Sequence, residues 1–244
     1  PIYAVLALLE EDLGCRWYTP EVPRIPEQET LTFRPQQRAY RPVLRLRDPY
    51  YKDAFNGTWS LRNRTNSRQV TLPEKWGGNL NYARGWFVHT FDRLIPPSQY
   101  FDEHPEYFSL VKGKRTHHDP GHTPGQLCLT NPEVLRIAIR KVRKVLETYP
   151  NAELISISEN DGRSGQCECE QCKAVNEREG TDAGTLVQFV NRIADAIAED
   201  YPDVTITTLA YGPTLASPKT ISPRDNVTIR VCTDLHAWKR PFLF

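Results

Sequence analysis

The second half of the chain alternates between two spacings of apolar residues. Apolar runs that predict strands cover 126–130, 152–158, 204–211 and 226–232, and amphipathic patterns that predict helices cover 131–150 and 183–202. Asn131 and Pro132 suit the N-cap and first position of the first helix. Strands and helices that alternate in this way predict a parallel sheet with helical crossovers. Strands with little polar alternation predict burial on both faces.

The first half is less regular. Apolar residues at helical spacing cover 3–13, and Gly14 follows as a C-cap. Strand-like runs occupy 30–35, 42–48 and 85–91, whereas 49–80 has little periodicity. A short helix and a turn are predicted for 96–110, followed by a hairpin that bends at Gly113. We expect residues 1–38 to be the end of a small α/β domain with a linker, and 39–244 to be a second domain.

Polar side chains follow several of the predicted strands. They are His89, Glu159, Asn160, Asp161, Tyr211, Asp234 and His236. No glycine-rich phosphate-binding loop follows any strand, and a (β/α)8 barrel places its active site at the C-terminal strand ends. The preferred fold class is therefore α/β, as a TIM barrel preceded by the end of the small domain. About six strands can be counted, so we expect a fragment that stops before the last two βα units.

Composition excludes several classes of protein. With 31 Lys and Arg against 30 Asp and Glu, the net charge is +1, so no electrostatic argument favours nucleic acid or an anionic membrane. No apolar run approaches the roughly 20 residues of a membrane span. Six cysteines in 244 residues are too few for a disulfide scaffold. We therefore expect neither a nucleic-acid partner nor a membrane span in this sequence.

Glu159, Asn160 and Asp161 stand where the 152–158 strand ends. Alternation along a strand would place Glu159 and Asp161 on one face. A glycosidase needs one group to protonate the leaving oxygen and another to supply or assist the nucleophile, which in some enzymes is the 2-acetamido group of the sugar. The triplet is therefore a candidate catalytic site. The alternative interpretation is that these residues only form a turn, because the sequence Asn160-Asp161-Gly162 favours a turn without any catalytic role.

Cys167, Cys169 and Cys172 are close enough in sequence to bind one metal ion, but a closed zinc site needs four ligands. A structural zinc is one interpretation. A redox pair, a disulfide between Cys169 and Cys172, and simple packing of the loop are the others. Cys128 and Cys232 lie in apolar strands and are expected to be inert.

Histidine and aromatic residues supply further candidates. His117, His118 and His122 share a polar loop, which favours a solvated loop over a metal site. His89 follows Trp86 and Phe87, where it would either bind a sugar or fill the core. Tyr211 and Trp238 follow strands, which favours contact with a sugar ring, although packing is the usual fate of a tryptophan.

Four stretches of the chain resemble one known family. They are YAVLALLEEDLGCRWYTP, YFDEHPEYFSLVKGKR, QLCLTNPEV and SISENDGRSGQCECEQCKA. Together they resemble the bacterial family DUF4838, which includes the endo-β-N-acetylglucosaminidases of glycoside hydrolase family 163. The resemblance implies a leading α/β domain, a (β/α)8 barrel and a retaining mechanism that uses the acetamide of the substrate. It also implies a glycan or glycoprotein substrate and a periplasmic or extracellular location.

The resemblance assigns roles to individual residues. Glu159 would be the general acid/base, and Asn160 or Asp161 would hold the acetamide. Tyr211 would donate a hydrogen bond there, while Asp234 and Trp238 would line the sugar site. No cofactor is required for this chemistry.

Two other functions remain open at this point. One is a carbohydrate-binding module without catalysis, built on a degenerate barrel. The other is a metal-dependent hydrolase centred on the cysteines with His117 and His118.

Overall fold

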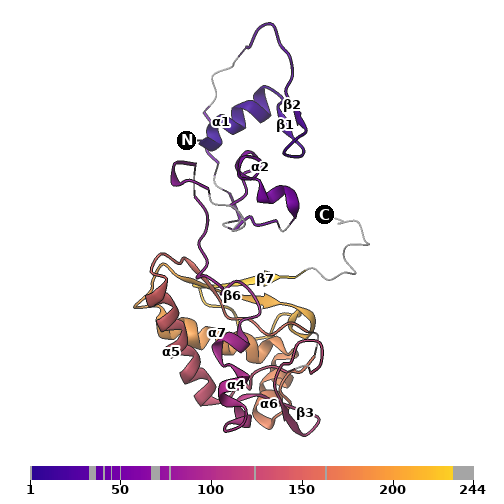
Figure 1. Cartoon of the computed structure of the whole chain (residues 1–244), viewed down its shortest axis with the longest axis vertical. Helices are drawn as coiled ribbons and strands as arrows, with labels where there is room; N and C mark the ends of the chain where they lie inside the picture. The colour runs from indigo at the N-terminus through magenta and orange to yellow at the C-terminus, as the bar shows by residue number, and fades with distance from the viewer. Residues whose placement is uncertain are drawn as a thin grey trace. The chain divides into compact units, whose positions relative to one another are not determined.

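The computed structural model describes residues 2–232 except 33–36, 41, 45, 50, 67–71, 77, 124 and 163. The chain divides into two compact units, Pro1–Asn81 and Tyr82–Phe244. The boundary between them lies after Asn81, whereas the sequence predicted a boundary after Arg38. Figure 1 shows the elements of both units, and each unit is described here by itself.

The first unit contains short elements. The predicted helix over 3–13 is confirmed as α1 (Ile2–Ala7) continued by a π-helical turn, η1 (Leu8–Asp12). A two-stranded antiparallel pair follows, β1 (Arg16–Trp17) and β2 (Pro23–Arg24). The remaining elements are η2 (Lys52–Phe55), α2 (Gly57–Arg62) and η3 (Glu74–Trp76). A small core of Leu6, Cys15, Trp17, Leu61 and Leu72 holds the unit together.

The strand predicted for 42–48 is wrong for the residues that the structure describes there. Residues 42–44 and 46–48 belong to no helix or strand. Val43 is 93% exposed, so its apolar side chain faces no core. Alternating apolar and charged residues suit a half-buried strand only where a partner strand covers one edge.

The second unit is built on a parallel sheet in the order β5 (Leu154–Ser156), β6 (Thr205–Ala210) and β7 (Val227–Val231). Residues 82–90 lie beside β5 and run parallel to it through an isolated bridge between Tyr82 and Leu154. The N–H of Ser156 donates to the carbonyl of Trp86, and the N–H of Thr90 donates to that of Ser158. The strand predicted for 85–91 is therefore wrong: the chain turns at Arg84 and Gly85, bends at Phe87 and Val88, and is helical from Phe91. Residues 86–90 nonetheless hydrogen-bond to β5 and to the residues that follow it.

Long amphipathic helices cover the sheet. Both predicted helices are confirmed, as α5 (Pro132–Thr148) and α7 (Ala183–Ile197). The side chain of Asn131 caps α5 by accepting from the N–H of Glu133 at 2.8 Å. Figure 1 shows α7 along the sheet with α5 beside it, and buried residues of both helices share one core with β5 and β6.

The sequence did not predict α6 (Glu170–Glu179), which falls in a region read as a loop. Its apolar residues form no clear stripe, and only Cys172 and Glu179 are buried. The signal that was available is Gly180, which ends the helix in the left-handed conformation with φ 75°.

Short elements connect residues 91–130. They are α3 (Phe91–Leu94), α4 (Pro97–Tyr100), η4 (Pro105–Tyr107), β3 (Ser109–Val111) and β4 (Lys114–Thr116). The predicted hairpin is confirmed, because β3 and β4 pair antiparallel around Lys112 and Gly113. The strand predicted for 126–130 is reduced to one antiparallel bridge between Leu127 and Phe108, so this segment lies outside the parallel sheet.

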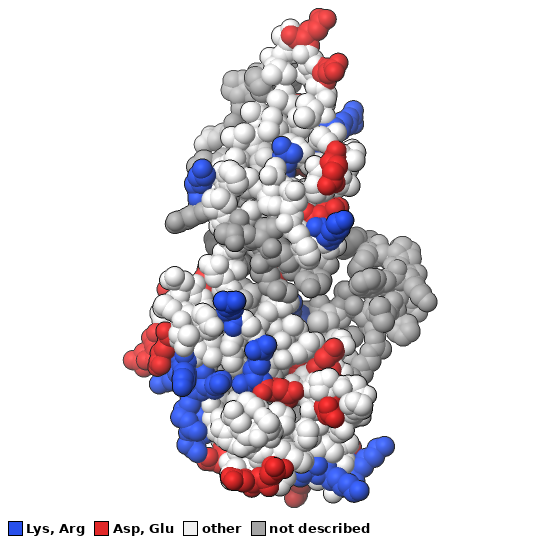
Figure 2. Space-filling view, in the orientation of Figure 1, with Lys and Arg blue, Asp and Glu red and all other residues white. Residues whose placement is uncertain are grey.

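The described helices and the surface charges can be compared with the apolar runs and the charge balance of the sequence. No helix among the described residues is long and apolar enough to cross a membrane. On the face of the second unit shown in Figure 2, basic and acidic side chains are interspersed.

Glu179 joins the end of α6 to the segment that precedes β7. Its side chain is buried, and Oε2 accepts the N–H of Thr220 at 2.8 Å and that of Ile221 at 3.2 Å. The hydroxyl of Thr220 donates as well, and Arg178 pairs with Oε1 at 2.9 Å. The backbone N–H and then the hydroxyl of Thr220 lower the pKa of Glu179 from 4.5 to about 2.

We expect Glu179→Gln to lower the Tm at pH 7, because the neutral amide cannot accept all of these donors. A depressed carboxyl pKa stabilises the fold above pH 4.5, and this stabilisation is lost as the pH falls toward 2. The gap in Tm between wild type and variant should therefore close over that range in thermal melts. Glu177→Gln, an exposed change on the same helix, serves as the control. An equal Tm for wild type and Glu179→Gln at pH 7 would refute this role.

Candidate functional site

The candidate catalytic residues lie where parallel strands end. Ser156 of β5 pairs with Thr207 of β6, and β6 pairs with β7 in the same direction. The carboxyl ends of these strands therefore share one edge of the sheet. Residues 157–161 continue from β5 at this edge, and Tyr211 follows β6 directly. Residues 82–90 bring His89 to the same edge through their pairing with β5.

Three of the predicted residues come together here. The hydroxyl of Tyr211 donates to Oδ1 of Asp161 at 3.2 Å, and Nε2 of His89 lies 3.7 Å from the same oxygen. The rings of His89 and Tyr211 meet edge to face with centroids 6.0 Å apart. The side chain of Asp161 is 68% exposed, so its carboxylate is accessible to a ligand.

His89 holds its position against a backbone preference. Its φ is 51°, in the left-handed region that side chains other than glycine rarely adopt. The N–H of His89 donates to the hydroxyl of Ser158 at 2.9 Å, and Nδ1 lies 2.8 Å from the carbonyl oxygen of Glu159. Backbone strain of this kind is concentrated at functional sites. With Nδ1 held, the ring presents Nε2 toward Asp161.

Glu159 occupies a different environment from Asp161. The residue is 3% exposed, and it lines a cavity of about 20 Å³. The cavity is lined by Phe91, Gln126, Leu127, Leu129, Gln166, Cys167, Cys172, Asp182, Thr185, Leu186 and Thr214. The expectation that Glu159 and Asp161 share a face is not met, because β5 ends at Ser156 and the alternation does not continue.

Burial sets the protonation of Glu159. The pKa of this carboxyl is raised from 4.5 to about 8, mainly by burial and to a smaller extent by the negative charge of Asp182. The hydroxyl of Thr214 lies 3.0 Å from Oε1 of Glu159, and this hydrogen bond lowers the pKa. Glu159 is therefore mainly protonated at neutral pH and can donate a proton.

Asn160 is fully engaged in hydrogen bonds. Its amide Nδ2 donates to Oδ1 of Asp92 at 2.8 Å and to the carbonyl of Gly125 at 3.2 Å, while Oδ1 accepts the N–H of Asp92 at 3.1 Å. The side chain of Gln126 bonds the N–H and the carbonyl of Asn160 at 2.8 and 3.1 Å. Asn160 thus fixes the strand end rather than facing a ligand. Asp234 and Trp238 lie outside the described residues.

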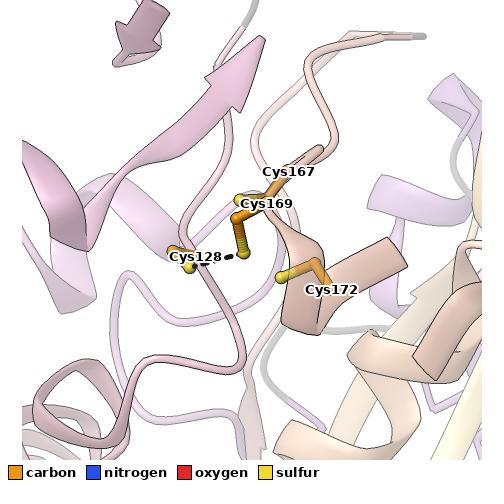
Figure 3. A group of neighbouring side chains, drawn as sticks. All are labelled: Cys128, Cys167, Cys169 and Cys172. Atoms are coloured by element: carbon orange, nitrogen blue, oxygen red, sulfur yellow. Dashed lines mark hydrogen bonds between the residues drawn. The ribbon is translucent and has the colours of Figure 1, made fainter. Parts of the chain in front are cut away.

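The cysteines form a second site. Cys167 and Cys169 precede α6, Cys172 lies in its first turn, and the fourth member is Cys128. All four are buried, and their sulfur atoms lie within 4.8 Å of one another. Figure 3 shows the side chain of Cys169 directed toward Cys128, with the two sulfurs 3.7 Å apart. All four are free thiols, and together they could hold a metal ion.

The prediction that Cys128 lies in a strand, apart from the other cysteines, is therefore wrong. Its run of apolar neighbours indicated a buried strand, but the antiparallel bridge at Leu127 carries Cys128 away from the sheet and toward the cysteine loop. The fourth cysteine could not be found from local spacing, because Cys128 lies 39 positions before Cys167 and only the fold brings them together.

The surroundings of the cysteines favour negative charge. The N–H of Leu110 donates to the sulfur of Cys167 at 3.4 Å, and the guanidinium of Arg115 lies 3.9 Å from it. Hydrogen bonds from the thiols of Cys167 and Cys172 lower the pKa of Cys128. The same contact with Cys128 raises the pKa of Cys167 to about 11. The proton affinities of these thiols therefore depend on one another.

The loop histidines take no part in this cluster. The ring of His117 packs against Phe101 with centroids 4.6 Å apart. Nδ1 of His118 instead lies 2.8 Å from Oδ2 of Asp92, a pairing that sequence spacing did not indicate. Among the described residues, the group with metal-binding geometry consists of the four cysteines.

Comparisons with known proteins identify a family but no characterised relative. No curated protein matches the chain, and no solved structure matches it. The sequence profile described as Domain of unknown function (DUF4838) matches residues 17–242, which is nearly the whole chain. The chain therefore belongs to the DUF4838 family.

Proposed function

We propose that this chain carries the active site of a glycoside hydrolase that cleaves a GlcNAc-containing glycan of the N-glycan type. The observation that carries the proposal is the meeting of Asp161, Tyr211 and His89 at the carboxyl ends of parallel strands. We further propose a glycan or glycoprotein as the substrate and a periplasmic or extracellular location, both from the likeness to endo-β-N-acetylglucosaminidases.

We propose that the fold is a (β/α)8 barrel of which this sequence contains only a part. Its support is the parallel order β5-β6-β7 with helices between β5 and β6, together with the parallel segment 82–90. Active sites of such barrels stand at the C-terminal strand ends, where Asp161 and Tyr211 lie.

The proposed reaction uses the acetamide of the substrate. Asp161 would accept the acetamide N–H, which makes the acetamide oxygen a better nucleophile, and Tyr211 would hold the group in place. The oxygen bonds to the anomeric carbon as the glycosidic bond breaks, and an acid protonates the leaving oxygen. Water then opens the cyclic intermediate, with the same acid acting as the base.

Glu159 is the proposed acid, because its raised pKa keeps a proton available at neutral pH. To serve in this role, the carboxyl must reach the glycosidic oxygen from its cavity beside α7. The burial of Glu159 also favours a second candidate function, a carbohydrate-binding module without catalysis. In such a module Asp161 and Tyr211 would bind the sugar and Glu159 would be a structural group.

Activity separates the two functions. The full-length protein should release glycan from an N-glycoprotein, as measured by mass spectrometry, and Asp161→Asn should reduce kcat by about 100-fold or more. Glu159→Gln, which resembles the protonated carboxyl in shape, should also abolish turnover because an amide is too weak an acid to transfer a proton to the leaving oxygen. Full activity of Glu159→Gln would remove Glu159 from the acid role. Sugar binding without turnover by the wild type would favour the binding module.

Stability provides an independent test of the protonation of Glu159. A carboxyl with a raised pKa contributes its stability below pH 4.5 and loses it as the pH rises through about 8. Relative to wild type, Glu159→Gln should therefore gain stability over this range, on the order of a few kcal/mol. Urea unfolding at several pH values measures the difference, with the exposed change Glu199→Gln as the control. A difference that stays constant with pH would show that Glu159 ionises normally.

We also propose that the metal ion held by the four cysteines is a structural zinc. Zinc favours four thiolates in a tetrahedron, in which sulfurs are about 3.8 Å apart. The separation of 3.7 Å between Cys128 and Cys169 fits this arrangement. The donors from Leu110 and Arg115 suit a cluster with net negative charge. Because all four ligands are protein thiolates, such a zinc would stabilise the loop and leave no position for a substrate.

Metal analysis tests the zinc. The purified protein should contain about one zinc per chain by elemental analysis. Cys128→Ser should lose most of it and unfold at a lower temperature, because the site would then have three thiolates. Cys232→Ser is the matched control, since Cys232 lies outside the cluster, and it should keep the metal. Wild-type protein that contains no zinc, or a Cys128→Ser variant that still binds about one zinc per chain, would contradict the proposal.

A further inference from the structure

Asp92 and His118 form a hydrogen-bonded pair next to the proposed catalytic residues. Nδ1 of His118 lies 2.8 Å from Oδ2 of Asp92, and the other oxygen, Oδ1, accepts from Asn160 at 2.8 Å. Asn160 directly precedes Asp161. Asn160 therefore helps to position both the Asp92–His118 pair and the exposed carboxylate of Asp161.

Both members of the pair are held in place. Asp92 is bonded to Asn160 by its side chain and by its N–H. The backbone of His118 lies against Gly125, where an added Cβ would come 2.6 Å from the N atom of His118. The carbonyl of Gly125 accepts in turn from Asn160. The loop therefore approaches the strand end through backbone contact, and a side chain at position 125 would push it away.

The hydrogen bond to Asp92 fixes the state of the imidazole. Nδ1 carries the proton that points at the carboxylate, so in the neutral ring Nε2 has a free lone pair. Among the residues that the structure describes, Nε2 has no hydrogen-bond partner, and the side chain keeps 13% of its surface exposed. The neighbouring His117 differs, because its ring packs on Phe101 and its Nδ1 bonds the carbonyl of His118.

We infer that Nε2 of His118 accepts a hydrogen bond from one hydroxyl of the sugar in the site, with Asp92 as the residue that orients the ring. The inference rests on the proposed function and adds a substrate-contacting residue to it. Sugar hydroxyls are hydrogen-bond donors, and an acceptor whose orientation is fixed in advance loses little entropy when it binds one.

The test compares substrates that differ by one hydroxyl. The parent substrate is a glycopeptide with a chitobiose core, and each derivative lacks one hydroxyl of the sugar that is cleaved. For wild type, loss of the hydroxyl that contacts His118 should lower kcat/KM by about tenfold. In His118→Ala this penalty should disappear for that derivative alone. His118→Gln should recover part of the activity, because its amide oxygen can accept a hydrogen bond near the position of Nε2.

The exposed change His122→Ala, in the same loop, is the control. It should leave the ratio of kcat/KM between the parent substrate and each derivative unchanged. A structural role for His118 would lower the activity toward all substrates equally, and unchanged penalties for all derivatives in His118→Ala would overturn the inference. Wild-type protein that does not cleave the parent would instead refute the proposed function. In that case, calorimetry compares the binding of the same substrates to wild type and to His118→Ala. Equal losses of affinity in both proteins for every derivative would overturn the contact. Disappearance of the loss for one derivative in His118→Ala would support it.

Discussion

The buried amide of Asn160 is the interaction on which the rest of the site depends. Its side chain joins the strand end to Asp92 and Gly125, and its backbone pairs with the side chain of Gln126. A buried polar group that loses its partner costs about 1–3 kcal/mol, so these contacts stabilise one another and are lost together. Because Asn160 is held on both its backbone and its side chain, Asp161 has little freedom and projects from the strand end.

The two carboxyls beside Asn160 lie in very different surroundings. Glu159 is buried beside a small cavity with apolar and polar walls and keeps its proton, whereas Asp161 is exposed and contacts Tyr211 and His89. A pair of acids with such different surroundings is typical of sites that need one proton donor and one anion. Adjacent positions in the sequence can diverge in this way because the regular strand ends at Ser156, before the acids begin.

Sequence patterns predicted the elements that depend on local periodicity. The helices after Asn131 and Asp182 were found because their apolar stripes are long, whereas α6 was missed because its burial depends on Cys172 and Glu179 alone. The meeting of Asp161 with Tyr211 followed from their places after parallel strands. The fourth cysteine and the Asp92–His118 pair were not predictable, because contacts between distant loops leave no periodic signal in one sequence.

The cysteine cluster and the candidate acid are physically linked. Cys167 and Cys172 line the same small cavity as the carboxyl of Glu159, so the loop that the cysteines hold forms one wall of that cavity. If this wall moved outward, water would enter and the carboxyl would ionise more easily, since burial is the main cause of its raised pKa. Cys167 and Cys172 therefore adjoin the buried carboxyl of Glu159, while the strand end two residues later presents the exposed carboxylate of Asp161.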